Sequence, residues 1–247
     1  MPLVETEAIV LRTFRLGEAD KIASLLTRQL GKFRAVASGA QRPKSRFGSC
    51  LEPLSYIRAW IYDRESRDLQ RLGSAEVIES FFGVQRDYRI QVAMQYVSEV
   101  AEGYLPEREL NERIFRLIVA VLRSLRHSGE VLQPLSYFNF WLLRLGGFLP
   151  DLERCGRCGS KLGDGPGYYG EGSEFLLCGE CRHGAPRQLF SAARAVAGKL
   201  RGFTPDQWLT QAIEPRGLMD LQDFLEELVE GHLGKKLVTR SLLAKVG

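Results

Sequence analysis

The sequence predicts an α+β protein: an N-terminal five-stranded barrel, then an all-helical domain with an inserted four-cysteine module. Three observations support this prediction. Apolar residues alternate with a period of two over about the first 80 residues, the spacing becomes helical after Glu79, and two C-x-x-C pairs lie within residues 151–187. We therefore expect one domain over 1–80 and a second over 81–247, with the cysteine module at about 151–187. Hydrophobic residues make up 45% of the 247 residues and charged residues 26%, as in a folded globular protein.

Five strands are predicted in the first domain, with turns at Gly17–Asp20 and Gly31. Residues 39–50 are rich in glycine, serine, proline and basic residues and predict a loop, and 63–68 predict a hairpin tip. Five short strands in about 80 residues are typical of a small Greek-key barrel such as the OB-fold, which binds nucleic acids. The predicted strands are Val4–Thr13, Ile22–Thr27, Lys32–Ser38, Ser55–Tyr62 and Leu69–Ile78.

Helical spacing dominates the second domain. Glu112–His127 carries an apolar stripe and ends at Gly129, and Gln133–Leu145 is apolar on several sides and ends at Gly146 and Gly147. The remaining predicted helices are Val92–Tyr104, Ser191–Leu200, Met219–His232 and a short segment near Leu242.

The distribution of charge is more informative than the net charge of +4. A run of six cations contains no Asp or Glu, and such local asymmetry can attract a polyanion. We therefore predict that this stretch contacts DNA; the alternative is an ordinary solvated loop. The six residues are Arg28, Lys32, Arg34, Arg42, Lys44 and Arg46.

An aromatic face is predicted on the fourth strand. Tyr56, Arg58, Trp60 and Tyr62 alternate with apolar residues and so share one side of it. Unpaired bases could stack on these rings, with Arg58 and Trp60 as DNA contacts. The same face could equally pack against the helical domain, and the sequence leaves both interpretations open.

The four paired cysteines predict one structural zinc ion. Cys155-x-x-Cys158 and Cys178-x-x-Cys181 are separated by nineteen residues, a spacing typical of a four-cysteine zinc site. Four thiolates complete a tetrahedron and leave no open position, so the site is predicted to be structural rather than catalytic. Cys50 stands alone and is interpreted as a small buried residue.

Enzymatic and membrane functions are poorly supported. The three histidines lie in no recognisable nucleophile, metal or acid–base motif, and no Gly-Lys pair is followed by the Ser or Thr of a phosphate-binding loop. There is no apolar run of 18 residues and no signal-peptide pattern at the N-terminus. We expect a cytoplasmic, non-enzymatic protein.

An ordered set of short motifs resembles the RecO-type recombination mediators. The set covers nearly the whole chain, and its order is more specific than any single piece. It comprises Ala8-Ile9-Val10-Leu11-Arg12, Gly17-Glu18-Ala19-Asp20, Leu26-Thr27 with Gly31-Lys32, Ala37-Ser38-Gly39-Ala40, Pro43-Lys44-Ser45-Arg46-Phe47-Gly48, Leu51-Glu52-Pro53, Gly146-Gly147-Phe148-Leu149-Pro150, the cysteine pairs and Gly234-Lys235-Lys236-Leu237.

The resemblance implies a bacterial, nucleoid-associated DNA repair and recombination protein. It implies binding to single- and double-stranded DNA through an OB-fold, with Arg42, Lys44 and Arg46 in the family's basic loop, and annealing of complementary strands. It also implies two partners, RecR and the C-terminal tail of the single-stranded DNA-binding protein, which together help to load recombinase.

For the partner's tail we name Arg113, Arg116 and Arg123, which recur along one face of the second helix; a solvated arginine face is the alternative. Two other functions stay open: another zinc-and-OB factor acting on RNA or in transcription, and a hydrolase or transferase whose site the sequence does not reveal.

Overall fold

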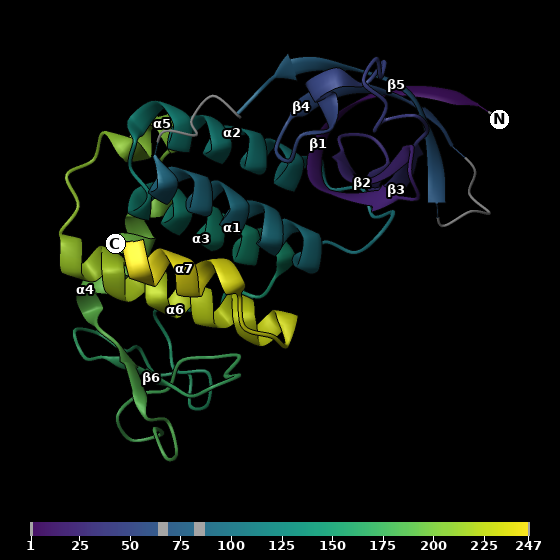
Figure 1. The fold of residues 1–247 in the computed structure, drawn as a ribbon. Coiled ribbons are helices and arrows are strands. Elements are labelled where there is room, and N and C mark those ends of the chain that lie inside the picture. The colour runs from purple at the N-terminus through teal and green to yellow at the C-terminus, as the bar shows by residue number, and fades with distance from the viewer. Residues whose placement is uncertain (1, 64–68, 82–86, 247) are drawn as a thin grey trace.

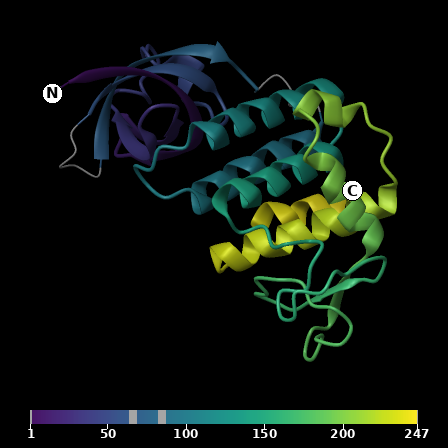
Figure 2. The same ribbon diagram turned by 180° about the vertical axis from the view of Figure 1, so that it is seen from behind.

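The computed structural model describes residues 2–63, 69–81 and 87–246. Figures 1 and 2 show a barrel at one end, a layer of helices in the middle and the cysteine module at the opposite end. The predicted fold class is confirmed. Part of the hairpin tip expected at 63–68 lies outside the described residues.

Five strands form the barrel: β1 (Leu3–Leu16), β2 (Asp20–Thr27), β3 (Gly31–Ala37), β4 (Tyr56–Tyr62) and β5 (Leu69–Glu79). The barrel is closed, with strand order β1-β2-β3-β5-β4. All neighbouring strands are antiparallel except β3 and β5, which are parallel. Phe33, Ala35 and Ala37 alternate along one strand and are buried in the barrel core, together with Ile57, Ala59 and Ile61 of another.

The loop predicted at 39–50 includes one short 3-10 helix, η1 (Gly48–Leu51). Cys50 belongs to it and is buried, as expected; its thiol donates a hydrogen bond to the carbonyl oxygen of Ala75 at 3.3 Å.

Seven α-helices form in the described part of the second domain. They are α1 (Tyr88–Tyr104), α2 (Glu112–Ser128), α3 (Leu132–Gly146), α4 (Ser191–Leu200), α5 (Pro205–Leu209), α6 (Pro215–Leu233) and α7 (Val238–Val246).

Two helices begin earlier than the apolar spacing predicted, because polar residues cap them. Asp87 accepts hydrogen bonds from the first turn of α1, and Glu214 does the same for α6, which begins at Pro215. Helix α5 was not predicted. It is too short to show a period, and it forms around a capping box at Thr204 and the fully buried Trp208.

The cysteine module contains a two-stranded sheet, β6 (Gly167–Tyr169) and β7 (Arg187–Leu189). Leu162, Tyr169 and Leu176 of this module belong to the same apolar core as the helices. The module therefore packs against the helices through buried apolar side chains.

The barrel packs directly on the helices. Ile9, Leu11, Leu26 and Tyr56 point out of the barrel and join the helical core. A buried hydrogen bond from the hydroxyl of Ser98 in α1 to the carbonyl oxygen of Leu11 lies in the same interface, at 2.7 Å. Within the described ranges, no helix has the length and hydropathy of a membrane span.

Candidate metal centre and nucleic-acid interface

The two C-x-x-C pairs converge on one point. The four sulfur atoms of Cys155, Cys158, Cys178 and Cys181 all lie within 4.8 Å of one another, and those of Cys158 and Cys178 are 3.7 Å apart. A tetrahedral ion with metal–sulfur bonds of about 2.3 Å would hold its sulfurs about 3.8 Å apart. The residues present therefore fit a metal ion that takes four thiolates.

Each pair is positioned by backbone hydrogen bonds in its own turn. The Gly159 amide donates to the carbonyl oxygen of Cys155 at 2.9 Å, and Gly159 takes a φ of +74°, which glycine adopts without strain. The amide of Cys181 donates to the carbonyl oxygen of Cys178 at 3.1 Å. The sequence did not indicate Ser160, whose hydroxyl lies 3.0 Å from the sulfur of Cys158.

The electrostatics of the cluster favour a cation. Burial raises the pKa of the Cys155 thiol, but the backbone amides of Cys158, Cys178 and Arg157 outweigh burial and lower this pKa to about 6. The backbone amide of Cys181 lowers the pKa of Cys178. The pKa of Cys181 rises to about 12, chiefly through its hydrogen bond with Cys178. Because converging thiolates repel each other, a bound cation would allow all four to ionise.

The loop after β3 presents the second half of the predicted basic stretch to solvent. Arg42, Lys44 and Arg46 are all exposed, and within the described residues none of them forms an ion pair. The side chain of Gln41 holds this loop against the β1–β2 turn by donating to the carbonyl oxygens of Gly17 and Asp20. The three cations are therefore presented from an anchored loop.

Known proteins resemble the whole chain. The family described as "Recombination protein O N terminal" matches residues 1–81, and "Recombination protein O C terminal" matches 85–241. A DNA repair protein RecO from Koribacter versatilis is 40% identical over 99% of both chains. One from Anaeromyxobacter dehalogenans is 32% identical over 100% of this chain and 98% of the relative, and one from a Nocardioides species is 39% identical over 95% and 96%.

The chain belongs to the RecO family.

In this RecO-family chain, the first two cations of the basic stretch, Arg28 and Lys32, lie where the barrel meets the helical domain. Arg28 pairs with Glu7 at 3.1 Å and with Glu112 of α2 at 2.7 Å. Lys32 is buried, which lowers its pKa, and its ammonium donates to the carbonyl oxygen of Glu102. The six cations share one stretch of sequence without Asp or Glu, but the structure places them in different surroundings.

Arg34 lies between the two halves of the stretch. It is exposed, and its guanidinium lies 3.9 Å from the carboxylate of Glu107, which is also exposed. A pair at this distance on an exposed surface is weak and leaves the cation accessible to other anions.

The aromatic face of β4 is divided as well. The ring of Tyr56 packs against Phe115 of α2, with centroids 6.0 Å apart. Arg58 lies 3.4 Å from a carboxylate oxygen of Glu5, and the indole nitrogen of Trp60 donates to the same side chain at 3.2 Å. Docking on the helices therefore accounts for Tyr56, while Arg58 and Trp60 lie beside an acidic neighbour.

The three arginines named for the partner's tail lie in different surroundings. Arg113 and Arg116 are exposed on α2 and form no ion pair within the part of the chain that the structure describes. Arg123 pairs with Glu79 at 2.8 Å and lies over the ring of Tyr56, 5.9 Å from its centroid. Arg123 therefore contributes to the barrel–helix interface.

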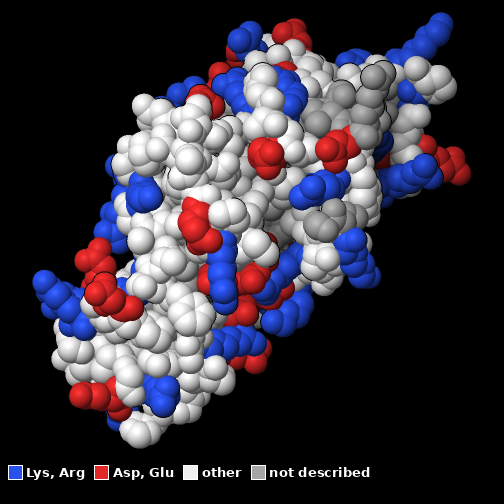
Figure 3. Space-filling model, turned by 90° about the vertical axis from the view of Figure 1, so that its left-hand side faces the viewer, with Lys and Arg blue, Asp and Glu red and all other residues white. Residues whose placement is uncertain are grey.

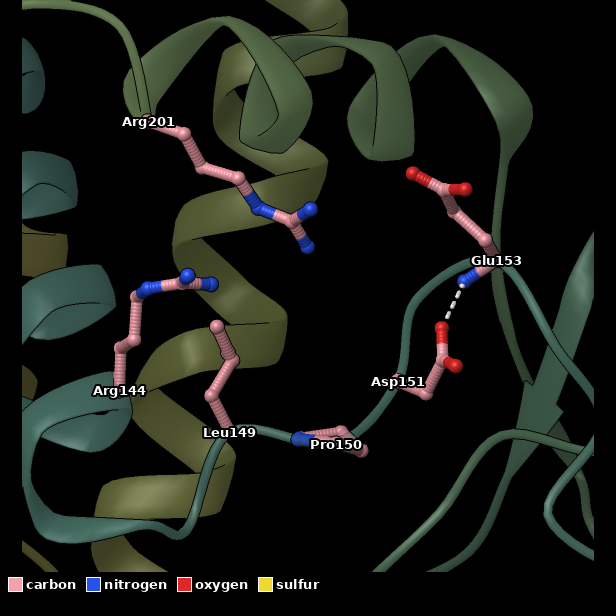
Figure 4. Close-up of a pocket in the computed structure, with 6 residues that line it drawn as sticks. All are labelled: Arg144, Leu149, Pro150, Asp151, Glu153 and Arg201. Atoms are coloured by element: carbon pink, nitrogen blue, oxygen red, sulfur yellow. Dashed lines mark hydrogen bonds between the residues drawn. The ribbon is translucent and has the colours of Figure 1, made fainter.

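A hollow of about 500 Å³ lies where α3 and α4 end and the cysteine module begins. Figure 4 shows the guanidinium groups of Arg144 and Arg201 on one side and the carboxylates of Asp151 and Glu153 on the other. Charges of both signs are also interspersed over the face in Figure 3. Neither surface is the uniformly cationic groove that a nucleic acid backbone favours.

Proposed function

We propose that this chain is a non-enzymatic recombination mediator that binds single- and double-stranded DNA and anneals complementary strands. The observation that carries the proposal is the anchored basic loop, in which Arg42, Lys44 and Arg46 are exposed beside a closed OB-fold barrel. Cations that meet phosphates release condensed counterions, which favours binding to any sequence. Membership of the RecO family supports a role in DNA repair.

The same proposal includes two protein partners and one metal ion. RecR and the C-terminal tail of the single-stranded DNA-binding protein are the partners, with which the chain helps to load recombinase on coated DNA in the bacterial cytoplasm, at the nucleoid. The metal is one structural zinc ion on the four cysteines. Four thiolates are the ligand set of structural zinc sites, which supports this choice.

For the tail we propose the exposed part of α2 around Arg113 and Arg116, with Arg123 at its edge. An acidic tail that ends in apolar residues and a carboxylate needs cations beside an apolar surface. Exposed arginines without acidic partners meet the first of these needs.

A strand-annealing assay tests the proposal. Complementary strands are coated with the single-stranded DNA-binding protein, and duplex formation is followed with and without the chain. We expect the chain to accelerate annealing without ATP, and complementary RNA strands serve as a comparison. Annealing at the uncatalysed rate, with no binding to gapped or duplex DNA, would contradict the proposal.

A further inference from the structure

A row of apolar side chains crosses the outer surface of the barrel on β1, β2 and β3. Phe14 lies opposite Ile22, Ile22 opposite Val36, and Val36 beside Arg71 of β5. Paired residues on neighbouring strands point to the same side of a sheet, so these side chains are contiguous. We call Phe14, Leu16, Ile22 and Val36 the outer stripe.

A bulge in β1 places Phe14 and Leu16 on this surface. The pairing of β1 with β2 shifts between Val10 and Arg12, so the residues that face outward become even-numbered beyond this point. Before the shift, Ile9 and Leu11 point outward into the helical core. After it, Phe14 and Leu16 lie outside the helical core and are 46% and 40% exposed.

The outer stripe adjoins the basic loop. It ends at the β1–β2 turn, where the amide of Gln41 donates to the carbonyl oxygen of Ala19 at 2.9 Å. The amide of Gly39 donates to the carboxylate of Asp20 at 2.7 Å. These bonds fix the loop that carries Arg42, Lys44 and Arg46 beside the exposed end of the stripe.

We infer that the outer stripe binds the unpaired bases of single-stranded DNA while the basic loop contacts the phosphates. The inference rests on the proposed DNA binding and assigns the residues that distinguish single strands from duplex. Single strands require an exposed aromatic ring on a surface that adjoins cations, and strands 2 and 3 form the binding face of OB-folds. Duplex DNA keeps its bases stacked inside and offers the stripe little to contact.

The β4 face is the alternative surface for base stacking, and its neighbours disfavour it. Trp60 pairs across strands with Glu5, and Arg58 lies between Glu7 and Glu76 in the sheet. Carboxylates at these positions repel a phosphate backbone. The outer stripe has Arg71 at its far end, where the guanidinium lies over the ring of Tyr62 at 5.5 Å from the centroid. The carboxylate that pairs with the stripe, that of Asp20 opposite Leu16, accepts a hydrogen bond from the amide of Gly39.

Phe14→Ala and Phe14→Trp in the full chain test the inference, with Phe190→Ala as a matched control. Phe190 is 45% exposed in the helical domain, far along the chain from the barrel. Binding of a fluorescent oligothymidylate and of a duplex of equal length is measured by anisotropy at several salt concentrations. We expect Phe14→Ala to weaken single-strand binding roughly tenfold or more.

The same variant should leave duplex affinity and the salt dependence unchanged, because stacking releases no counterions. Phe14→Trp and Phe190→Ala should bind like the parent. If Phe14→Ala binds single strands like the parent, or loses both DNA forms equally, the inference is overturned. A parent that binds neither form would instead contradict the proposed function itself.

Discussion

Arg28 of the barrel donates two hydrogen bonds to one carboxylate oxygen of Glu112, from Nε at 2.9 Å and from Nη2 at 2.7 Å. The two residues are 84 positions apart in the chain. The cation at the start of the basic stretch is therefore occupied within the protein, across the boundary between the domains. Arg42, Lys44 and Arg46 have no such partner among the described residues, and this difference separates their expected roles.

Charge reversal in the loop should weaken DNA binding strongly. With Arg42, Lys44 and Arg46 all changed to Glu, we expect lower affinity for every sequence and a salt slope reduced by roughly 2 to 3, because each phosphate contact releases counterions. Titrations at several salt concentrations measure both. Arg28→Ala is the control and should leave the slope unchanged; a triple variant that binds like the parent would remove the loop from the site.

Loss of one cysteine should release the metal and leave the barrel folded. Cys158→Ser removes one of four ligands, and structural zinc contributes roughly 10–16 kcal/mol of apparent binding energy in small modules. We expect one zinc per parent chain by elemental analysis and a large loss in the variant, with increased proteolysis within 151–187. Cys50→Ser, which changes a cysteine outside the cluster, should keep its zinc. A parent purified without chelators that contains no zinc would contradict the assignment.

Glu99 should stabilise the C-terminal helix. Its carboxylate accepts hydrogen bonds from the amides of Val238 and Thr239 at 3.1 and 3.0 Å and from the Thr239 hydroxyl at 2.6 Å. Glu99→Ala leaves these donors without their partner, which should cost about 1–3 kcal/mol in the free energy of unfolding. Glu130→Ala, at an exposed position, should change stability by less than about 0.5 kcal/mol.

The effect of Glu99 should depend on pH. Burial opposes its ionisation, but the hydrogen bonds from Thr239 and Val238 outweigh burial and lower the pKa of the carboxyl. Because the folded pKa lies below the unfolded one, the stabilisation is complete above the unfolded pKa and is lost as pH falls through the folded pKa. Urea unfolding of the parent and of Glu99→Ala at neutral and acidic pH should show the gap narrowing in acid; a constant gap would show that ionised Glu99 is not the cause.

Tail binding and DNA binding should be separable. A fluorescent peptide with the acidic C-terminal sequence of the single-stranded DNA-binding protein is titrated into the parent, an Arg113→Glu/Arg116→Glu variant and the loop triple variant. We expect only the α2 variant to lose the peptide, since the loop lies on the barrel. Arg123→Glu alone breaks the pair with Glu79, so its stability must be measured alongside. Peptide binding lost only in the loop variant would place the tail on the OB-fold.

Much of the architecture follows from local patterns. The inward residues of β3 and β4 are set by strict alternation, and the four cysteines are set by two short turns whose geometry needs little from the rest of the chain. The starts of α1 and α6 and the whole of α5 were harder to predict, because caps and one buried tryptophan decide them rather than a repeating apolar pattern.

The candidate DNA site shows most clearly what local patterns leave undecided. The sequence determined that a run of six cations contains no acid, and it determined the barrel face on which each strand residue lies wherever alternation is unbroken. Only the tertiary structure decided that Glu112 and the backbone at Glu102 engage Arg28 and Lys32, since these partners lie 84 and 70 residues away. It also decided that Phe14 faces solvent. One extra residue at the bulge in β1 exchanges the inward and outward positions beyond it, and an alternating pattern does not show where such a residue is inserted.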